Sequence, residues 1–342
     1  MPVHLCSTNG YENFHSDLNE NIKCRNCTDD STRKIENCQL DKNYDLGISY
    51  TMMMHFGEYL CFSNKHRFGI WNLDGTDIPK GFAKYYKACT KVLPSSEFSR
   101  NTFLTAGVPN EIMTVIPHGY NPNFINKTDI YPIETVRKRK ILVNIQQNHL
   151  RKNIPGILDA WGKAFSNKDD VAMILKTKIK KTKDSDVSWQ DEILKMKKKY
   201  KNNAPIIIIE KFIDDLSSLY RACDVIFSAS NIECFLLPAL EGIVSNKIVI
   251  ASNWGGNVDF MNNKNSLLIN GAVGRAPERM HYWGSSAYGK CFYPDTNHAA
   301  ELLQKSVKNY DSLIQEFQPG IDKIKQKYTW KNVAKQIIGL TQ

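Results

Sequence analysis

Residues 228–260 read SASNIECFLLPALEGIVSNKIVIASNWGGNVDF. Two β-branched runs, Asp224–Phe227 before a possible helix and Ile248–Ala251 after it, predict short buried strands. Pro238 suits the first turn of that helix, because the N–H that proline lacks would have no helical partner there. The free N–H groups and the helix dipole at this end favour an anion such as a phosphate. The stretch therefore predicts a strand, loop, helix and strand with a ligand at the start of the helix.

Two acidic residues and a glycine loop lie in this unit where a ligand is expected. Glu233 falls on the loop before the helix and Glu241 in its first turns, which puts both carboxylates on the ligand side. Two carboxylates can bind two sets of hydroxyl groups. After the second strand, Gly255 and Gly256 allow the backbone to approach a ligand closely, because glycine has no Cβ.

The run from Glu233 to Glu241, ECFLLPALE, resembles the E-x7-E motif of retaining GT-B glycosyltransferases of the family 4 type. That motif usually reads EGFGLPLLE, so Cys234 and Leu236 replace glycines, and we expect their side chains to narrow the sugar pocket. The resemblance implies that Glu233 binds the donor sugar and Glu241 the ribose hydroxyls. The intervening residues with expected donor contacts are Cys234, Phe235, Leu236 and Leu237. The alternative is a plain amphipathic helix with two solvated acids.

Length and composition indicate a two-domain soluble protein. The chain has 342 residues, of which 42% are hydrophobic and 23% charged, and it suits two domains with a core each. No apolar run approaches the roughly 20 residues of a membrane span. The first residues lack the pattern of a secretory signal, so we expect a cytoplasmic protein. The nine cysteines, scattered along the chain, fit reduced thiols in that compartment.

The net charge of +10 favours anionic partners such as nucleotide diphosphates, acidic lipid surfaces or nucleic acid. Much of the excess lies in two clusters, Lys176–Lys183 and Lys195–Lys201. A nucleic-acid surface would interleave arginines and aromatic rings, whereas these runs are nearly all lysine. We therefore expect solvated lysine faces, with a weak affinity for an anionic membrane surface at most, and no nucleic-acid partner.

In the first half of the chain, Leu46–Tyr50 and Arg67–Trp71 are predicted to be strands. The loop after the second strand, Asn72–Pro79, is expected to face a cleft, because ligands bind at the carboxyl ends of parallel strands. Asp74 in this loop takes a position where the resembled enzymes carry a polar or acidic group near the acceptor. A buried or capping aspartate is the alternative.

Two further segments of the first half resemble the same family. Lys91–Phe103 is similar to its VPSxFSRxxF segment, in which Ser95 or Ser96 would cap the next helix. Thr114–Tyr120 is similar to the end of the family's first domain. His118 there is a candidate to contact the donor phosphate or a sugar hydroxyl, since a neutral imidazole can donate or accept. A structural histidine at a domain junction is the alternative.

The second half opens with a predicted strand, Ile141–Ile145, and an anion-ready loop before the helix Ile154–Phe165. The resembled family carries an arginine and a lysine here that bind the donor diphosphate. Lys152 aligns with that lysine, but glutamine stands at the arginine position, and Arg151 is our candidate to supply the missing charge. Further along, Phe212 and Ile213 are candidates for the nucleobase pocket or, alternatively, core residues.

Two possible metal motifs are weak. Cys24-Arg-Asn-Cys27 has zinc-knuckle spacing, and the residues that could complete four ligands are His4, Cys6, His15 and Cys38. Incidental thiols are the alternative. Asp184-Ser-Asp186 spells DxD in a polar, lysine-rich stretch, which favours a solvent turn. We expect no metal and no cofactor beyond the substrate.

These observations predict an α/β protein of GT-B architecture, with two Rossmann-like domains facing a cleft. Residues 1–122 would form a reduced acceptor-side domain joined by a C-terminal helix over 325–342, residues 123–140 a linker, and residues 141–324 the donor domain. The expected reaction is sugar transfer from a UDP- or GDP-sugar to a hydroxyl of a glycan, lipid or protein-linked acceptor, with retention and without a metal. The candidate catalytic residues are Glu233, Lys152, Arg151, Asp74 and His118. The alternatives are a sugar-nucleotide epimerase or hydrolase of the same fold, and a non-catalytic basic binding protein.

Overall fold

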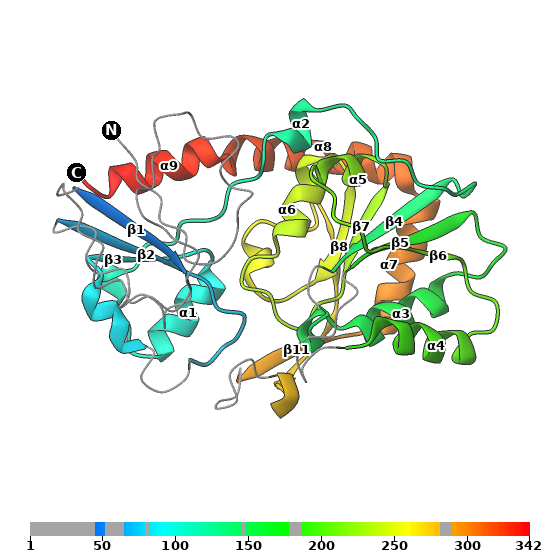
Figure 1. Ribbon diagram of the computed structural model, residues 1–342, viewed down its shortest axis with the longest axis horizontal. Helices are drawn as coiled ribbons and strands as arrows, with labels where there is room; N and C mark the ends of the chain where they lie inside the picture. Colours follow the sequence, from blue (N-terminus) through cyan, green and yellow to red (C-terminus); the bar gives the residue numbers. More distant parts are fainter. Residues whose placement is uncertain (1–44, 52–64, 79–82, 146–147, 178–186, 281–288) are drawn as a thin grey trace.

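The computed structural model describes residues 45–51, 65–78, 83–145, 148–177, 187–280 and 289–342. The candidate zinc ligands, the Asp184–Asp186 motif and most of the first lysine cluster lie outside these residues. Figure 1 shows two lobes side by side, with the last two helices running across the top of both.

The first domain is built on a three-stranded parallel sheet of order β1-β2-β3. Its elements are β1 (Leu46–Thr51), β2 (His66–Trp71), the 3₁₀ helix η4 (Ala83–Ala88), β3 (Lys91–Pro94), α1 (Glu97–Thr105) and the 3₁₀ helix η5 (Asn110–Ile112). Of the two candidate capping serines, Ser96 is the cap, because its hydroxyl accepts from the N–H of Ser99. The strand β3 therefore delivers Ser96 to the carboxyl edge of the sheet, where α1 begins.

The second domain contains a six-stranded parallel sheet of order β6-β5-β4-β7-β8-β9. Its strands are β4 (Arg139–Asn144), β5 (Val171–Lys176), β6 (Ile206–Ile209), β7 (Val225–Ser228), β8 (Ile248–Ser252) and β9 (Leu267–Ile269). Its helices are α3 (Ile154–Ala164), α4 (Trp189–Lys199), α5 (Ser217–Arg221), α6 (Leu237–Val244), α7 (Thr296–Lys308) and α8 (Tyr310–Lys327), with short 3₁₀ turns η6 (Leu150–Lys152), η7 (Gly256–Asp259) and η8 (Glu278–Met280). In this order the chain reverses direction across the sheet between β4 and β7, which is the switch point at which doubly wound sheets bind ligands.

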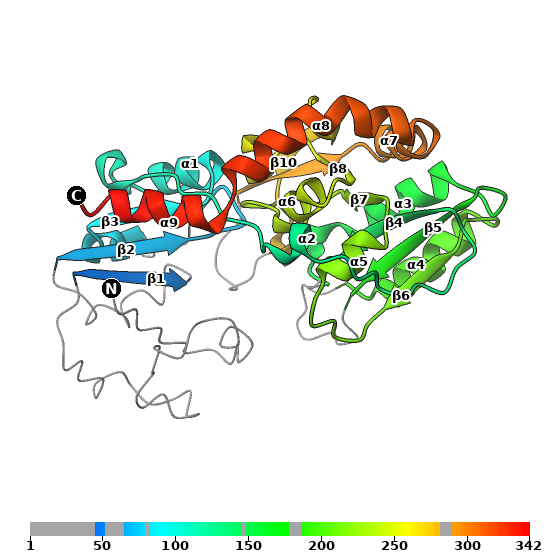
Figure 2. The ribbon, with the colours of Figure 1, turned by 90° about the horizontal axis from the view of Figure 1, so that it is seen from above.

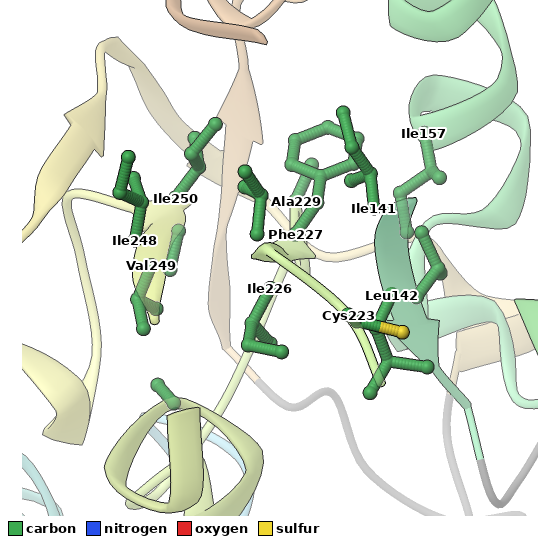
Figure 3. Packing of buried hydrophobic residues seen from close by; sticks show 14 of the residues in the cluster. Ile141, Leu142, Ile157, Cys223, Ile226, Phe227, Ala229, Ile248, Val249 and Ile250 are labelled. Atoms are coloured by element: carbon green, nitrogen blue, oxygen red, sulfur yellow. The ribbon is translucent and has the colours of Figure 1, made fainter. Parts of the chain in front are cut away.

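The core of the second domain is apolar on both faces of this sheet, as parallel strands covered by helices require. All of β5 and β8 is buried, and Figure 3 shows Phe227 and Ile226 packed beside Ile250 and Ile141. Helix α3 packs against α4 and α7, while α6 packs against β7, β8 and α8. The α/β fold class predicted from the sequence is confirmed.

Two connections join the domains. One is the stretch that contains α2 (Asn123–Asn126), and the other is the passage from α8 into α9 (Trp330–Gly339). Figure 2 shows α9 lying along β2 and β3, where Val333 and Ile337 pack with Phe68 and Leu93. The last helix is therefore part of the core of the first domain.

Three details differ from the sequence-based expectation. Strand β4 begins at Arg139, two residues early, because Arg139 already pairs with Val171 of β5. Lys176 is not on a solvated lysine face: it ends β5 between two neighbouring strands, is buried, and its Nζ donates to the carbonyl of Thr177. The region after Ile269, to which the sequence analysis assigns no helix or strand, contains the antiparallel pair β10 (Gly271–Arg275) and β11 (Lys290–Pro294).

Among the described residues, the helices are all too short or too polar to span a bilayer.

Candidate active site

The candidate site lies at the switch point, where the loops after β4 and β7 meet. Asn153 adopts a left-handed conformation (φ 53°) and caps α3 by accepting from the N–H of Gly156. Its side chain also donates to the carbonyl of Ala229, and the N–H of Asn231 donates to the carbonyl of Arg151. These bonds tie the two loops together, so Arg151 is held next to the loop that carries Glu233.

Arg151, Lys152, Glu233 and Asp74 form one network of ion pairs. Lys152 Nζ lies 2.5 Å from Glu233 Oε1, and Arg151 Nη1 lies 3.1 Å from Glu233 Oε2. Arg151 Nη2 lies 3.0 Å from Asp74 Oδ2, across the boundary between the domains. Arg151 and Glu233 are buried, and Lys152 and Asp74 are partly buried. Four of the five candidate catalytic residues are therefore brought together, with their two positive and two negative charges balanced.

Asp74 remains a carboxylate in this network. Burial raises its pKa, but the charges of Arg151 and Lys152 and a hydrogen bond from the N–H of Cys234 outweigh burial and hold the pKa below its usual value. A partly buried carboxylate keeps a lowered pKa only while the cations face it. An anionic ligand at Arg151 would therefore have to compete with Asp74.

Helix α6 begins beside this network with its first N–H groups free of a side-chain cap. Leu236 precedes the helix in a left-handed conformation (φ 68°), and Pro238 lies in the first turn. This conformation costs a non-glycine residue roughly 1–2 kcal/mol, and the resembled motif has glycine there. Leu236 retains it while buried against the core. The start of α6 therefore has no side-chain cap, although the N–H of Ala239 donates to the carbonyl of Leu236.

Glu241 belongs to a second group of polar side chains, together with Tyr220 and Asn144. The hydroxyl of Tyr220 donates to Glu241 Oε2 at 2.9 Å and accepts from Asn144 Nδ2 at 3.1 Å. Burial raises the pKa of Glu241 to about 7, although the hydrogen bond from Tyr220 acts in the opposite direction. The sequence interpretation missed Tyr220 and Asn144. The signal for Asn144 was its position, a polar residue at the carboxyl end of the apolar strand β4.

Gly255 and Gly256 pack against the loop of Glu233. The N–H of Gly256 donates to the carbonyl of Glu233 at 2.9 Å. A Cβ on Gly256 would lie 1.7 Å from the carbonyl oxygen of Cys234, and Gly255 has a φ of 102°. The close approach that we predicted for these glycines is therefore made to the protein backbone.

His118 is buried among aromatic rings. Its ring centroid lies 4.8 Å from that of Phe235, 5.8 Å from Tyr50 and 6.3 Å from Trp330. Burial lowers the pKa of His118 to about 4, so the imidazole is neutral near pH 7. Its described contacts are aromatic and join α9 and β1 to the E-x7-E segment.

The remaining candidates differ in exposure. Phe212 is 72% exposed, while Ile213 is partly buried and packs against the core of the second domain. Leu237, at the first position of α6, is 36% exposed.

A cavity of about 450 Å³ lies elsewhere, between α8 and the loop after η7, and contains none of the candidate site residues. It is lined by Asp259, Phe260, Asn262, Asn263, Lys264, Asn265, Glu316, Pro319, Gly320, Lys323, Ile324, Lys327 and Tyr328.

The two domains, with the candidate site at the switch point of the second, have the GT-B architecture. Residues 127–280, which hold most of the second domain, match the family model of glycosyl transferases group 1. Among solved structures, the fold is similar to HepE of Anabaena in complex with UDP and glucose, with a TM-score of 0.68, 14% identity, and coverage of 87% of this chain and 77% of that one. It is also similar to sucrose-phosphate synthase of Thermosynechococcus elongatus, with a TM-score of 0.64, 16% identity, and coverage of 87% and 73%.

A curated relative, the probable sucrose-phosphate synthase of Thermosipho melanesiensis, is 21% identical over 288 residues. The alignment covers 81% of this chain but only 58% of the relative, so the chain spans little more than half of that protein's length. Together, the matched family model and these solved structures support the GT-B fold for this chain.

Proposed function

We propose that this protein transfers a sugar from a nucleotide-diphosphate sugar to an acceptor hydroxyl, with retention of the anomeric configuration. The observation that carries the proposal is the convergence of Arg151, Lys152 and Glu233 at the switch point, beside the uncapped start of α6. Two cations beside a helix start that has no side-chain cap suit a diphosphate, and an adjacent carboxylate suits the hydroxyls of the sugar attached to it.

The diphosphate would take the place that the carboxylates now hold on the two cations. Arg151 matches two phosphate oxygens at once, and Lys152 adds a point charge. With the N–H groups of α6, they stabilise the charge that develops as the bond from the anomeric carbon to the diphosphate breaks. The new bond to the acceptor oxygen forms on the same face, and the acceptor proton leaves with the diphosphate. These groups meet the leaving-group charge without a metal, so we propose metal-independent transfer.

The remaining roles follow from the two polar groups. Glu241 would bind the ribose hydroxyls of the donor, supported by Tyr220, and Glu233 the transferred hexose. The complexes of HepE with UDP and with UDP-glucose support a UDP-sugar as the donor. Asp74 comes from the first domain, so we place the acceptor, a glycan or a lipid, on that side of the cleft.

The decisive experiment separates the two glutamates. Calorimetry with UDP-, GDP- and ADP-sugars first identifies the donor. Glu241→Gln should then weaken the binding of the donor and of the free nucleotide diphosphate alike. It should also raise KM, because the ribose contacts are the same in the ground and transition states. Glu233→Gln should lower kcat by on the order of tenfold or more, since its carboxylate faces the sugar as positive charge develops.

Free UDP is the control for this assignment. If Glu233→Gln weakens UDP as much as Glu241→Gln does, the assignment of the two residues is wrong. Consumption of the donor at the same rate with and without an acceptor would favour the epimerase or hydrolase alternative. Loss of transfer in EDTA, restored by Mn²⁺, would disprove metal independence.

A further inference from the structure

The backbone of Cys234, the residue after Glu233, is held at both ends by side chains of the other domain. Its N–H donates to Asp74 Oδ1 at 2.8 Å, and its carbonyl accepts from Ser96 Oγ at 2.6 Å. Asp74 follows β2 and Ser96 follows β3, so both come from the carboxyl edge of the first sheet. They lie 160 and 138 residues from Cys234 along the chain.

Ser96 has two tasks in this contact. Its oxygen caps α1 by accepting from the N–H of Ser99 at 3.1 Å. Its single proton faces the carbonyl of Cys234 at 2.6 Å, which is nearer than the alternative acceptor, Ser99 Oγ at 3.2 Å. A hydroxyl can do both, because it donates one hydrogen bond and accepts others.

The rest of the first turn of α1 also contacts the second domain. The N–H of Glu97 donates to Asp259 Oδ2 at 2.7 Å. The ring of Phe98 packs edge-on against that of Trp254, with 4.9 Å between the ring centroids. Gly256 leaves the room for this contact, since a Cβ there would lie 2.7 Å from Ser96 Oγ. The start of α1 is therefore fitted to the loop of Glu233 and to the glycine loop together.

We propose that Ser96 is a positioning residue for sugar transfer, which together with Asp74 fixes the Cys234 peptide so that Glu233 is correctly placed only when the two domains are closed. This inference rests on the proposed function. Its consequence is a separation of roles: the nucleotide is bound by residues of the second domain, whereas the placement of Glu233 depends on the first.

The test replaces Ser96 by glycine. Glycine is nearly as good a helix N-cap residue as serine and buries no charge at this fully buried position, but it has no hydroxyl to donate to the carbonyl of Cys234, so the fold is kept while the cross-domain bond is lost. Ser95→Ala is the matched control, because Ser95 is an adjacent buried serine whose hydroxyl makes no hydrogen bond to the described residues. The readouts are the melting temperature, the Kd of UDP, the kcat of transfer, and the radius of gyration from small-angle X-ray scattering.

For Ser96→Gly we expect a melting temperature within about 5 °C of the wild type, a UDP affinity within about twofold of the wild type, a kcat lower by on the order of tenfold, and a larger radius of gyration in the absence of ligand. Ser95→Ala should match the wild type in all four. An unchanged kcat in stable Ser96→Gly protein overturns the proposal, as does a loss of UDP affinity equal to the loss in kcat. If the wild type binds no nucleotide sugar, the proposed function fails, and the scattering experiment still decides whether Ser96 holds the domains closed.

Discussion

Asp74 forms an ion pair with the guanidinium of Arg151, which is the group that would bind the proposed diphosphate. The ion pair is 3.0 Å long and partly buried, where charged hydrogen bonds contribute more than at a surface. Asp74→Asn should therefore bind UDP more tightly, by several-fold up to about tenfold. Asparagine keeps an oxygen that can accept from the N–H of Cys234, so the contact between the domains is retained.

Isothermal titration with UDP checks this expectation. Asp77→Asn, in the same loop, is the control for the loss of one negative charge near the boundary between the domains. Weaker or unchanged UDP binding in Asp74→Asn alone would show that Asp74 does not compete with the ligand.

Glu241 should make the stability of the protein depend on pH between about 4.5 and 7. Burial raises its pKa in the folded state to about 7 from an ordinary value of 4.5. The folded state therefore binds the proton more tightly, and the stability that this group contributes is complete below the ordinary pKa and is lost as pH rises through the raised one.

The variant Glu241→Gln lacks this titration. Its melting temperature relative to the wild type should rise as pH increases from 4.5 to 7 and level off above that range. Parallel melting curves of the two proteins against pH would show that Glu241 ionises normally in the folded state.

At the scale of elements, the start of α6 combines the proposed anion site with backbone strain. Leu236 is left-handed and uncapped, in the position where the resembled motif has glycine. Leu236→Ala and Leu236→Gly both remove the buried side chain, but only glycine adopts this conformation freely. The glycine variant should therefore be more stable to unfolding than the alanine variant by about 0.5–1 kcal/mol, even though glycine loses more backbone entropy on folding.

Urea unfolding of the two variants measures this difference. Ala239→Gly, inside the same helix, provides the comparison, and glycine should cost it about 1 kcal/mol. Alanine as stable as glycine at position 236 would mean that the left-handed conformation carries no strain.

The elements of the second domain could be predicted because their signals are local. The β-branched runs of β7 and β8 and the proline of α6 stand in the sequence itself, and the family resemblance singled out Glu233 and Lys152, which form an ion pair in the structure. The contacts of Asp74 and Ser96 with Cys234 could not be predicted in the same way. They depend on how two separately folded domains meet, and no periodicity in either segment indicates the partner.

At the scale of the whole molecule, α9 couples the stability of the first domain to the end of the chain. Ile337 is buried with Phe68, Leu93 and Ile116, so Ile337→Ala should destabilise the first domain by about 2–5 kcal/mol. Ile338 is the matched control, because it is 53% exposed, and Ile338→Ala should change stability by no more than about 0.5 kcal/mol.

Urea unfolding followed by hydrogen exchange distinguishes the two domains. We expect faster exchange in β2 and β3 of Ile337→Ala and unchanged exchange in β7 and β8. Equal effects of the two alanine variants would show that α9 does not complete the core of the first domain.

The path of the chain also sets an order of events during synthesis on the ribosome. Tyr120, at the end of the first domain, bonds through its hydroxyl to the carbonyl of Lys325, 205 residues later, and α9 follows beyond that point. At about 5–20 residues per second, translation takes roughly 10–40 s to cover this distance. The sheet of the first domain emerges before the second domain, but its covering helix α9 is made only after α7 and α8. Of the two domains, the one that is synthesised earlier is thus the later to complete its fold, and it is the one that nascent-chain chaperones would have to protect.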